Sequence, residues 1–138
     1  MEYKEYGAKN NDIIILLHGG GLSWWNYIDE ISLLENEFHI VIPILDGHSG
    51  SDTNFTSIES NALEIINFIN KNYNGKVKLI GGLSLGGQIL LEILSKNPNI
   101  CECAIIESAL VIPMDFTYKM IEPIFNLLYC LISKEILA

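Results

Sequence analysis

The amino-acid sequence predicts an α/β fold, in which a doubly wound, mostly parallel β-sheet carries helices on both faces. Two observations lead to this fold class. Short apolar runs rich in β-branched residues alternate along the chain with longer segments of helical period. The apolar runs are continuous, which is typical of strands buried on both faces, and the intervening segments are long enough to connect parallel neighbours.

The first half of the chain contains two of these strands and one helix. Residues 12–17 read Asp-Ile-Ile-Ile-Leu-Leu, a run that predicts a buried strand. Glycines follow, and residues 23–35 have a helical pattern. Residues 38–44 predict a second buried strand, which ends near Pro43, and residues 3–6 predict a short edge strand.

A second helix is expected to begin at Thr56. Thr56 and Glu59 have the spacing of a capping box, in which side chains satisfy free N–H groups of the first turn. Gly75 stands where a helix C-cap glycine is expected. Between these signals, five apolar residues at helical spacing form one face: Ile58, Ala62, Ile65, Ile66 and Ile69.

The second half of the chain continues the alternation. Residues 76–80 predict a third strand, which turns through two glycines into a helix at residues 85–96. Residues 100–107 predict a fourth strand. Residues 118–137 predict a further helix with a break near Pro123, because proline removes a helical hydrogen bond. A chain of 138 residues is expected to form one compact domain.

Composition and charge narrow the classes of function. The formal net charge is −9, so nucleic acid and anionic membrane surfaces would repel the protein. All eight basic residues are lysines, and without arginine there is no planar bidentate clamp for carboxylates or phosphates. The glycines match neither a phosphate-binding loop nor a dinucleotide-binding pattern. We therefore expect a small uncharged or apolar substrate, no nucleic-acid partner and no cofactor; the sequence indicates no oligomeric state.

Cysteine usage favours a reducing, cytoplasmic compartment. The three cysteines are an odd number, and the charged first ten residues do not resemble a secretory signal. No apolar run reaches the ~20 residues that a membrane-spanning helix needs. Cys101 and Cys103 alternate along the fourth strand without a second pair at metal-ligand spacing, so they are expected to be buried apolar residues.

The strongest motif is Gly82-Leu83-Ser84-Leu85-Gly86, between the third strand and the helix that follows it. A sharp strand-to-helix turn leaves its central residue strained, with the side chain exposed. The flanking glycines are needed because a Cβ at either place would collide with the neighbouring strand and helix. The helix N-terminus supplies free N–H groups that favour a developing oxyanion. The pattern predicts Ser84 as a nucleophile.

A second loop, His18-Gly19-Gly20-Gly21, follows the Ile-rich strand. Acyl transfer needs two N–H donors on one oxyanion, one after the nucleophile and one from another loop. The sequence predicts that Leu85 supplies the first donor and Gly20 the second. A glycine run alone is equally typical of a flexible turn, so this interpretation depends on the serine motif beside it.

A third loop, residues 46–52, contains aspartate and histidine among glycine and serine. Its spacing matches no familiar set of metal ligands, so no metal site is expected. A turn held by its own side-chain hydrogen bonds is the favoured interpretation.

Together the three loops resemble the α/β-hydrolase superfamily. The motifs occur in the order and spacing of that family, with Ser49 where glycine is usual: His18-Gly19-Gly20, then Gly47-His48 with Ser51-Asp52, then the Ser84 motif. The resemblance implies hydrolysis of an ester-like or related carbonyl substrate. Ser84 would attack the carbonyl, the amides of Leu85 and Gly20 would hold the oxyanion, and water would release the acid.

The implied mechanism also needs a histidine base and an acid. Members of the family place both after the serine, whereas His18, His39 and His48 all precede Ser84. The resemblance implies a structural role for His18. Glu107, at the end of the fourth strand, is a candidate acid or an ordinary polar residue at a strand end.

The last part of the sequence resembles the start of a lid. Family members insert a lid after the fourth strand, so residues 1–112 are expected to form the core and residues 113–138 to begin the lid. The last strands of the usual sheet are missing, which leaves residues 100–107 as an apolar edge of a kind that natural proteins avoid. We therefore expect the N-terminal half of a hydrolase, truncated before its catalytic histidine. Two alternatives stay open: a non-catalytic protein that binds a small apolar ligand, and an incomplete product that folds poorly.

Overall fold

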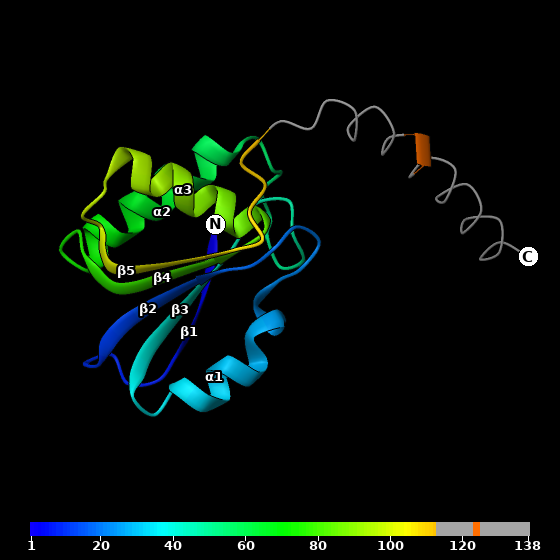
Figure 1. Ribbon diagram of the computed structural model, residues 1–138. Helices are drawn as coiled ribbons and strands as arrows, with labels where there is room; N and C mark the ends of the chain where they lie inside the picture. Colours follow the sequence, from blue (N-terminus) through cyan, green and yellow to red (C-terminus); the bar gives the residue numbers. More distant parts are fainter. Residues whose placement is uncertain (113–122, 125–138) are drawn as a thin grey trace, which may run out of the picture.

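A computed structural model describes residues 1–112 and 123–124 of the chain. Apart from residues 123–124, the expected helix at 118–137 and the expected lid at 113–138 lie outside the described residues. The described part contains one five-stranded sheet in the order β1-β3-β2-β4-β5 (Figure 1). The strands are β1 (Glu2–Tyr6), β2 (Asp12–Leu17), β3 (Phe38–Ile44), β4 (Val77–Leu83) and β5 (Cys101–Glu107).

All but one of these strands run parallel. β2 pairs with β3 and with β4, and β4 pairs with β5, all in parallel, whereas β1 pairs antiparallel with β3. The register places Leu17 of β2 beside Gly82 of β4, and Leu83 of β4 beside Glu107 of β5. The prediction of a mostly parallel α/β sheet with a short N-terminal edge strand is confirmed.

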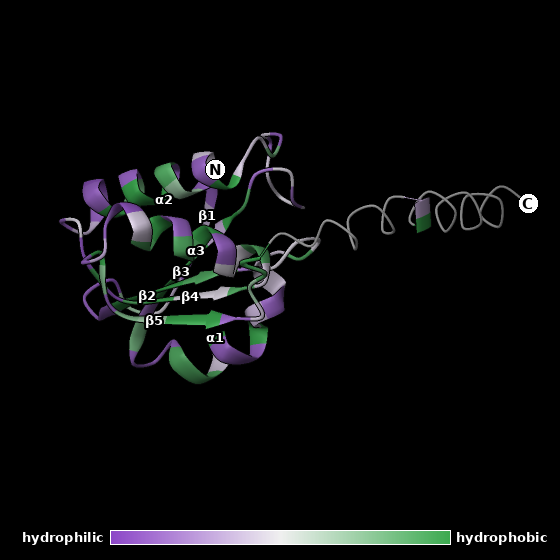
Figure 2. Cartoon of the chain, turned by 45° about the horizontal axis from the view of Figure 1, so that its top comes forward, coloured by the Kyte–Doolittle hydropathy of each residue, from purple (hydrophilic) through white to green (hydrophobic). Residues whose placement is uncertain are grey.

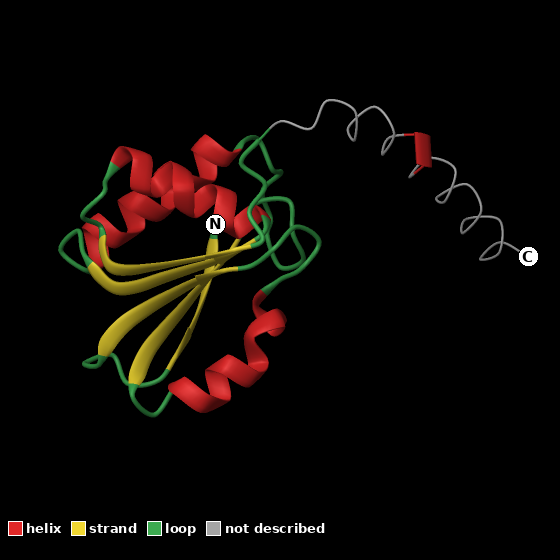
Figure 3. Cartoon of the chain, viewed as in Figure 1, coloured by secondary structure: helices red, strands yellow, loops and turns green. Residues whose placement is uncertain are grey.

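Helices cover both faces of this sheet (Figure 3). One helix is expected at residues 23–35, but the chain forms two, because Tyr27 leaves helical angles (φ −108°, ψ 22°) where its hydroxyl donates to Leu17 O at 3.0 Å. None of the described helices is both long and apolar enough to span a membrane. The 3-10 helix η1 (Trp24–Tyr27) and α1 (Ile28–Leu34) cover one face, and α2 (Ile58–Asn72) and α3 (Leu85–Lys96) cover the other.

The start of α2 also differs from the expectation. Ser57, not Thr56, is the N-cap: its backbone is extended (φ −162°, ψ 166°), and its Oγ accepts from the Ser60 N–H at 3.1 Å. Because residue 57 is extended, the helix begins one residue later than a cap at Thr56 requires. At the C-terminal end of α2 the expected C-cap glycine is confirmed: Gly75 has φ +80° and donates its N–H to Ile69 O at 3.3 Å.

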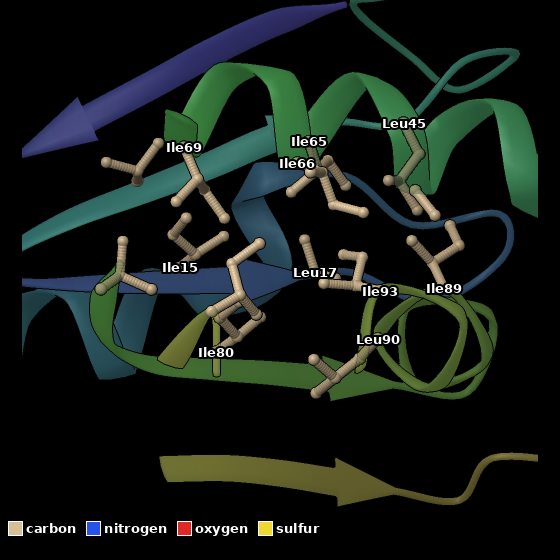
Figure 4. Close-up of a cluster of buried hydrophobic side chains, with 14 residues drawn as sticks. Ile15, Leu17, Leu45, Ile65, Ile66, Ile69, Ile80, Ile89, Leu90 and Ile93 are labelled. Atoms are coloured by element: carbon tan, nitrogen blue, oxygen red, sulfur yellow. The ribbon is translucent and has the colours of Figure 1, made fainter. Parts of the chain in front are cut away.

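Two apolar clusters join the helices to the sheet. The smaller joins η1 and α1 to β2 and β3. The larger lies between the sheet and helices α2 and α3 (Figure 4). Fully burying one such side chain contributes about 1.5–3 kcal/mol, so this packing fixes the strand ends that carry the loops. Fully buried members of the larger cluster include Ile15, Ile65, Ile80, Ile89 and Ile93.

β5 is one of the two edge strands of the described sheet and is largely exposed. Figure 2 shows that this exposed strand is mostly apolar. Cys101 is half-buried and Cys103 is exposed. The expectation of a buried side chain is therefore wrong for Cys103. It lies on the same face of β5 as Ile105, and in the described part of the chain the helices on that face pack over β2 and β3 instead.

Candidate active site

The loops that the sequence singled out begin at the carboxyl ends of the parallel strands. β2 ends there and leads into the glycine run (residues 19–21), and β4 ends there and leads into Ser84 (Figure 1). β4 is longer than the expected strand at 76–80, because Gly82 pairs with Leu17 instead of leaving the sheet. β4 therefore leads directly into Ser84 at its carboxyl end.

Ser84 forms the sharp turn between β4 and α3. Its backbone has φ 51° and ψ −110°, a region that residues other than glycine rarely adopt. Such strain costs on the order of 1–3 kcal/mol and persists only where the surroundings fix it. Two hydrogen bonds hold the turn: Ser84 N–H donates to Glu107 O at 2.8 Å, and Gln88 N–H donates to Ser84 O at 3.0 Å. Ser84 is exposed beside the first turn of α3.

Two glycines make room for this serine turn (residues 82–86). A Cβ on Gly82 would lie 2.5 Å from Gly86 O, and a Cβ on Gly86 would lie 2.1 Å from Leu17 O. Both distances are far inside van der Waals contact, so α3 can start this close to β2 and β4 only because neither residue has a side chain. The first glycine faces the helix and the second faces the neighbouring strand, as the motif predicts.

The glycine run lies against the serine turn. A Cβ on Gly19 would lie 3.6 Å from Ser84 Cβ, and a Cβ on Gly20 would lie 3.9 Å from Leu85 Cβ. Gly21 has φ +74°, which glycine adopts without strain, and this lets the chain turn back after Gly20 has come close to Leu85. The structure thus brings Gly20, Ser84 and Leu85 to one place.

His18 holds the glycine run in position. The ring is fully buried, Leu45 N–H donates to Nε2 at 3.1 Å, and Nδ1 lies 3.0 Å from Gly19 O. A backbone N–H needs an acceptor at Nε2, so the neutral ring carries its proton on Nδ1 and donates it to Gly19 O. Burial lowers the pKa of His18 below its ordinary value. With both nitrogens engaged, His18 has none left to take a proton from Ser84.

The other two histidines are placed for different roles. His48 Nδ1 lies 3.0 Å from Asp46 O, and its ring packs edge-on against His18 with 5.0 Å between the ring centroids. His39 lies near the start of β3, at the end of the strand opposite to the loops. Among the described residues, no hydrogen bond joins Ser84 Oγ to any of these rings.

Glu107 ends β5 beside the serine turn. Its carbonyl oxygen is the acceptor for Ser84 N–H, and its side chain is exposed. Glu107 and Glu30 also line a hollow of about 160 Å³ on the α1 side of β4 and β5. Tyr27 lines the same hollow, and burial raises its pKa to about 12, so this phenol stays protonated. The carboxylates give the rim of the hollow a negative charge.

The loop after β3 is a turn held by its own side chains, as expected. The Thr53 hydroxyl donates to the buried Asp46 carboxylate, and Ser51 Oγ lies 3.0 Å from Thr53 Oγ1. Sequence reasoning missed Asn61, whose Oδ1 accepts from Asp46 N–H at 3.1 Å and whose Nδ2 donates to Ser57 O at 3.0 Å. The signal that could have revealed it is an asparagine in the first turn of α2, directly before Ala62 of the apolar face.

Comparisons with known proteins agree with this fold. A family model described as the alpha/beta hydrolase fold matches residues 12–128. A protein of Cyberlindnera fabianii, named "probable alcohol acetyltransferase", is 29% identical over 102 residues, which are 71% of this chain and 27% of that protein. The chain therefore spans about a quarter of the length of this curated relative.

Two solved structures have the same fold at low identity. A hydrolase from Pseudomonas aeruginosa has a TM-score of 0.78 at 16% identity, over 91% of this chain and 48% of its own. A thermophilic esterase from Thermogutta terrifontis has a TM-score of 0.74 at 22% identity, over 83% of this chain and 42% of its own. With the family model matching most of its length, the chain belongs to the α/β-hydrolase family and spans part of that fold.

Proposed function

We propose that this chain is the nucleophile-bearing part of a serine hydrolase that cleaves ester-like substrates through an acyl-enzyme on Ser84. The observation that carries the proposal is the backbone of Ser84, held at φ 51° between β4 and α3 with the residue exposed. Strain of this kind clusters at sites where function needs a side chain in one place. An incidental serine in a glycine-rich turn would need neither the strained angle nor the crowded glycines around it.

The proposed reaction starts with attack of Ser84 Oγ on the substrate carbonyl carbon. The Oγ–C bond forms as a base takes the hydroxyl proton, and the carbonyl oxygen becomes an oxyanion. The N–H groups of Leu85 and Gly20 would receive this oxyanion. Leu85 is the first residue of α3, where the N–H has no helical partner, and it lies against Gly20. The alcohol then leaves with a proton from the base, and water cleaves the Ser84 ester to release the acid.

In this proposal the base lies outside residues 1–112. The nitrogens of His18 are both engaged, and the chain spans less than half of the two solved relatives. We propose that the chain is the N-terminal part of a hydrolase, that further polypeptide supplies the histidine, and that residues 113–138 begin a lid. Glu107, whose backbone contacts Ser84, is the candidate acid that would orient this histidine.

The proposed substrate is small and uncharged or apolar. A net charge of −9 and the lack of arginine both disfavour anionic substrates. We also propose a reducing, cytoplasmic compartment, because the chain has an odd number of cysteines.

A fluorophosphonate probe with imidazole as an added base tests the assignment of Ser84. The probe reacts with activated serine hydroxyls, and imidazole in solution can take the place of the histidine base. We expect imidazole to accelerate labelling of Ser84 in the 138-residue chain at least about tenfold more than labelling of an ordinary exposed serine. Mass spectrometry of the labelled peptide identifies the site.

Two variants control this experiment. Ser84→Ala should lose the imidazole-dependent labelling, whereas Ser95→Ala should keep it, because Ser95 is an exposed serine at the far end of α3. Equal labelling rates at Ser84 and Ser95 would show that Ser84 is not activated and would refute the proposed role.

The second candidate function is non-catalytic binding of a small apolar ligand by the loops around Ser84. The observation that favours it is the lack of any hydrogen bond between Ser84 Oγ and a histidine among the described residues. The same experiment separates the two candidates. Failure of labelling with imidazole present, together with measurable binding of an unreactive ester analogue in a calorimeter, would favour binding over catalysis.

A further inference from the structure

A second hollow lies at the end of the sheet opposite to Ser84. It has a volume of about 480 Å³ and opens between β1, the start of β2 and the C-terminal end of α2. Sites for small molecules are typically clefts of roughly 300–1,000 Å³, so this one has the size of such a site. Two aromatic rings, Phe68 and Tyr73, line it together with one carboxylate, Glu5, and one ammonium group, Lys9. We call it the Glu5 hollow.

The buried ring of His39 holds the Glu5 carboxylate at this hollow. Nε2 lies 3.3 Å from Glu5 Oε2 and 3.4 Å from the Tyr73 hydroxyl. A carboxylate oxygen repels a nitrogen lone pair at this distance, so the neutral ring carries its proton on Nε2 and leaves Nδ1 bare. Nδ1 is buried and has no hydrogen-bond partner among the described residues. Burying such a nitrogen lowers stability, which an apolar side chain at this place would not do. The contact with Glu5 therefore explains the imidazole better than packing does.

Lys9 is the other charged partner of Glu5, and it is easily replaced. Its Nζ lies 3.3 Å from Glu5 Oε2, but its side chain is 83% exposed. Exposed ion pairs contribute little to stability, because water screens both charges and the long side chain loses freedom when it pairs. A cation that enters the hollow can therefore take the place of the Lys9 ammonium on the carboxylate.

The two aromatic rings favour a cation at this place. Tyr3 stacks on Phe68 with 3.8 Å between the ring centroids, and Phe68 meets Tyr73 edge-on at 5.6 Å, so neighbours hold both rings in position. A cation is attracted to the face of an aromatic ring, and more strongly where water is excluded. Burial raises the pKa of Tyr73 to about 12, so at neutral pH Glu5 is the one anion among the described residues that line the hollow.

We propose that the Glu5 hollow binds a small organic molecule with a primary ammonium group and an apolar body. The ammonium would replace Lys9 on the Glu5 carboxylate, and the body would lie against Phe68 and Tyr73. Asn72 fits the same ligand, because its Nδ2 already donates to Phe68 O at 2.8 Å and its Oδ1 remains to accept an N–H. The net charge of −9 also favours a cation. The site does not depend on the chemistry proposed at Ser84.

Titration of the 138-residue chain with phenethylammonium in a calorimeter, at low ionic strength, tests the site. We expect saturable binding to one site, and binding of phenethyl alcohol, which has the same body without the charge, should be at least about tenfold weaker. Glu5→Gln should weaken binding of the amine at least about tenfold, and Phe68→Leu at least about threefold. The control Glu2→Gln removes the same charge from the other face of β1 and should bind unchanged.

Lys9 provides a test of opposite sign. Lys9→Ala removes the ammonium that competes for Glu5, so the variant should bind phenethylammonium about two- to threefold more tightly. Its control, Lys4→Ala, removes the same charge from the other face of β1 and should leave binding unchanged. Circular dichroism checks that every variant is folded.

Several outcomes would overturn the proposal. These are no saturable binding of phenethylammonium, equal binding of the alcohol, and unchanged binding by the folded Glu5→Gln variant. Equal losses in Glu5→Gln and Glu2→Gln would show only a general attraction of cations to an acidic protein, and weaker binding by Lys9→Ala would contradict the exchange of ammonium groups. Tighter binding of Nα-acetyl-lysine amide than of phenethylammonium would assign the hollow to a lysine side chain of a partner protein instead of a free amine.

Discussion

The substitution Gly86→Ala tests the contact on which the serine turn depends. Inside a helix, alanine in place of glycine normally stabilises a protein by about 0.5–1 kcal/mol. Gly86 lies in the first turn of α3 and has no positive φ, so nothing in its backbone angles opposes this gain. The new Cβ, however, would lie 2.1 Å from Leu17 O and 2.8 Å from His18 O. Both are backbone atoms, which cannot swing aside as the end of a side chain can.

The steric cost should exceed the gain in helix propensity. Ordinary contacts of a Cβ begin at 3.4 Å, so α3 and the end of β2 would have to separate by about 1 Å. Over-packing typically costs about 1–3 kcal/mol and costs more where backbone must move. We therefore expect Gly86→Ala to lower the free energy of unfolding by about 2–3 kcal/mol, which corresponds to roughly 10 °C in melting temperature.

Urea unfolding followed by circular dichroism measures this change, with Gly20→Ala as the matched control. A Cβ on Gly20 meets nothing closer than 3.9 Å, so the control should stay within about 0.5 kcal/mol of the unchanged chain. Equal stability of Gly86→Ala and Gly20→Ala would refute the reasoning, because α3 could then not lie against the end of β2 as described.

Three further predictions concern Ser84, His18 and the start of α2. Ser84→Gly relieves the strained backbone, so we expect a gain of about 1 kcal/mol in urea unfolding together with loss of fluorophosphonate labelling; unchanged stability would argue against strain at this residue. His18→Phe leaves the Leu45 N–H unpaired and should cost about 1–3 kcal/mol at neutral pH. Burial lowers the pKa of His18, so as the pH falls below 6.5 the unfolded chain binds a proton before the folded chain does. The free energy of unfolding therefore decreases as the pH falls through this range. In His18→Phe this dependence of the free energy of unfolding on pH should be weaker. Ser57→Ala should cost about 1 kcal/mol and Thr56→Ala almost nothing, and equal urea midpoints for these two variants would contradict the cap at Ser57.

The sheet could be predicted closely because buried parallel strands leave a strong signal in composition. The apolar runs at 12–17 and 38–44 coincide with β2 and β3. The helix at 85–96 coincides with α3, because a glycine-rich turn precedes it and Pro98 follows it. In these elements the local pattern and the tertiary environment favour the same conformation, so the sequence alone is sufficient.

Features that depend on contacts far along the chain could not be predicted in this way. The break between η1 and α1 lies at Tyr27, whose hydroxyl donates to Leu17 O, a partner that no local pattern identifies. Asn61 links Asp46 to the first turn of α2 and reads in the sequence as one more polar helix residue. The exposure of Cys103 depends on what covers β5, which its own alternating pattern does not encode.

The candidate site could be predicted as a set of loops, and the resemblance implied a structural role for His18, but the contacts of its ring could not be predicted. The string His18-Gly19 does not say which ring nitrogen carries a proton. The structure answers this through Leu45 N–H, which needs an acceptor at Nε2 and so excludes this ring as the base for Ser84. The pairing partner comes from the end of β3, more than twenty residues away in sequence, so only the fold reveals it.

The two halves of the proposed chemistry therefore have different physical origins. The N–H groups near Ser84 are fixed by the serine turn and by His18, so the proposed binding of an oxyanion there would require little reorganisation. Proton transfer, by contrast, needs a group that residues 1–112 do not place on Ser84. In serine hydrolases that lose one member of the triad, the oxyanion donors and substrate binding alone retain an acceleration on the order of 10³–10⁴ over water. Three levels of reactivity toward a fluorophosphonate should follow: slow for the chain alone, faster with imidazole, and fastest with a bound polypeptide that supplies a histidine. Acceleration by that polypeptide in a Ser84→Ala variant would show that the reactive serine lies elsewhere.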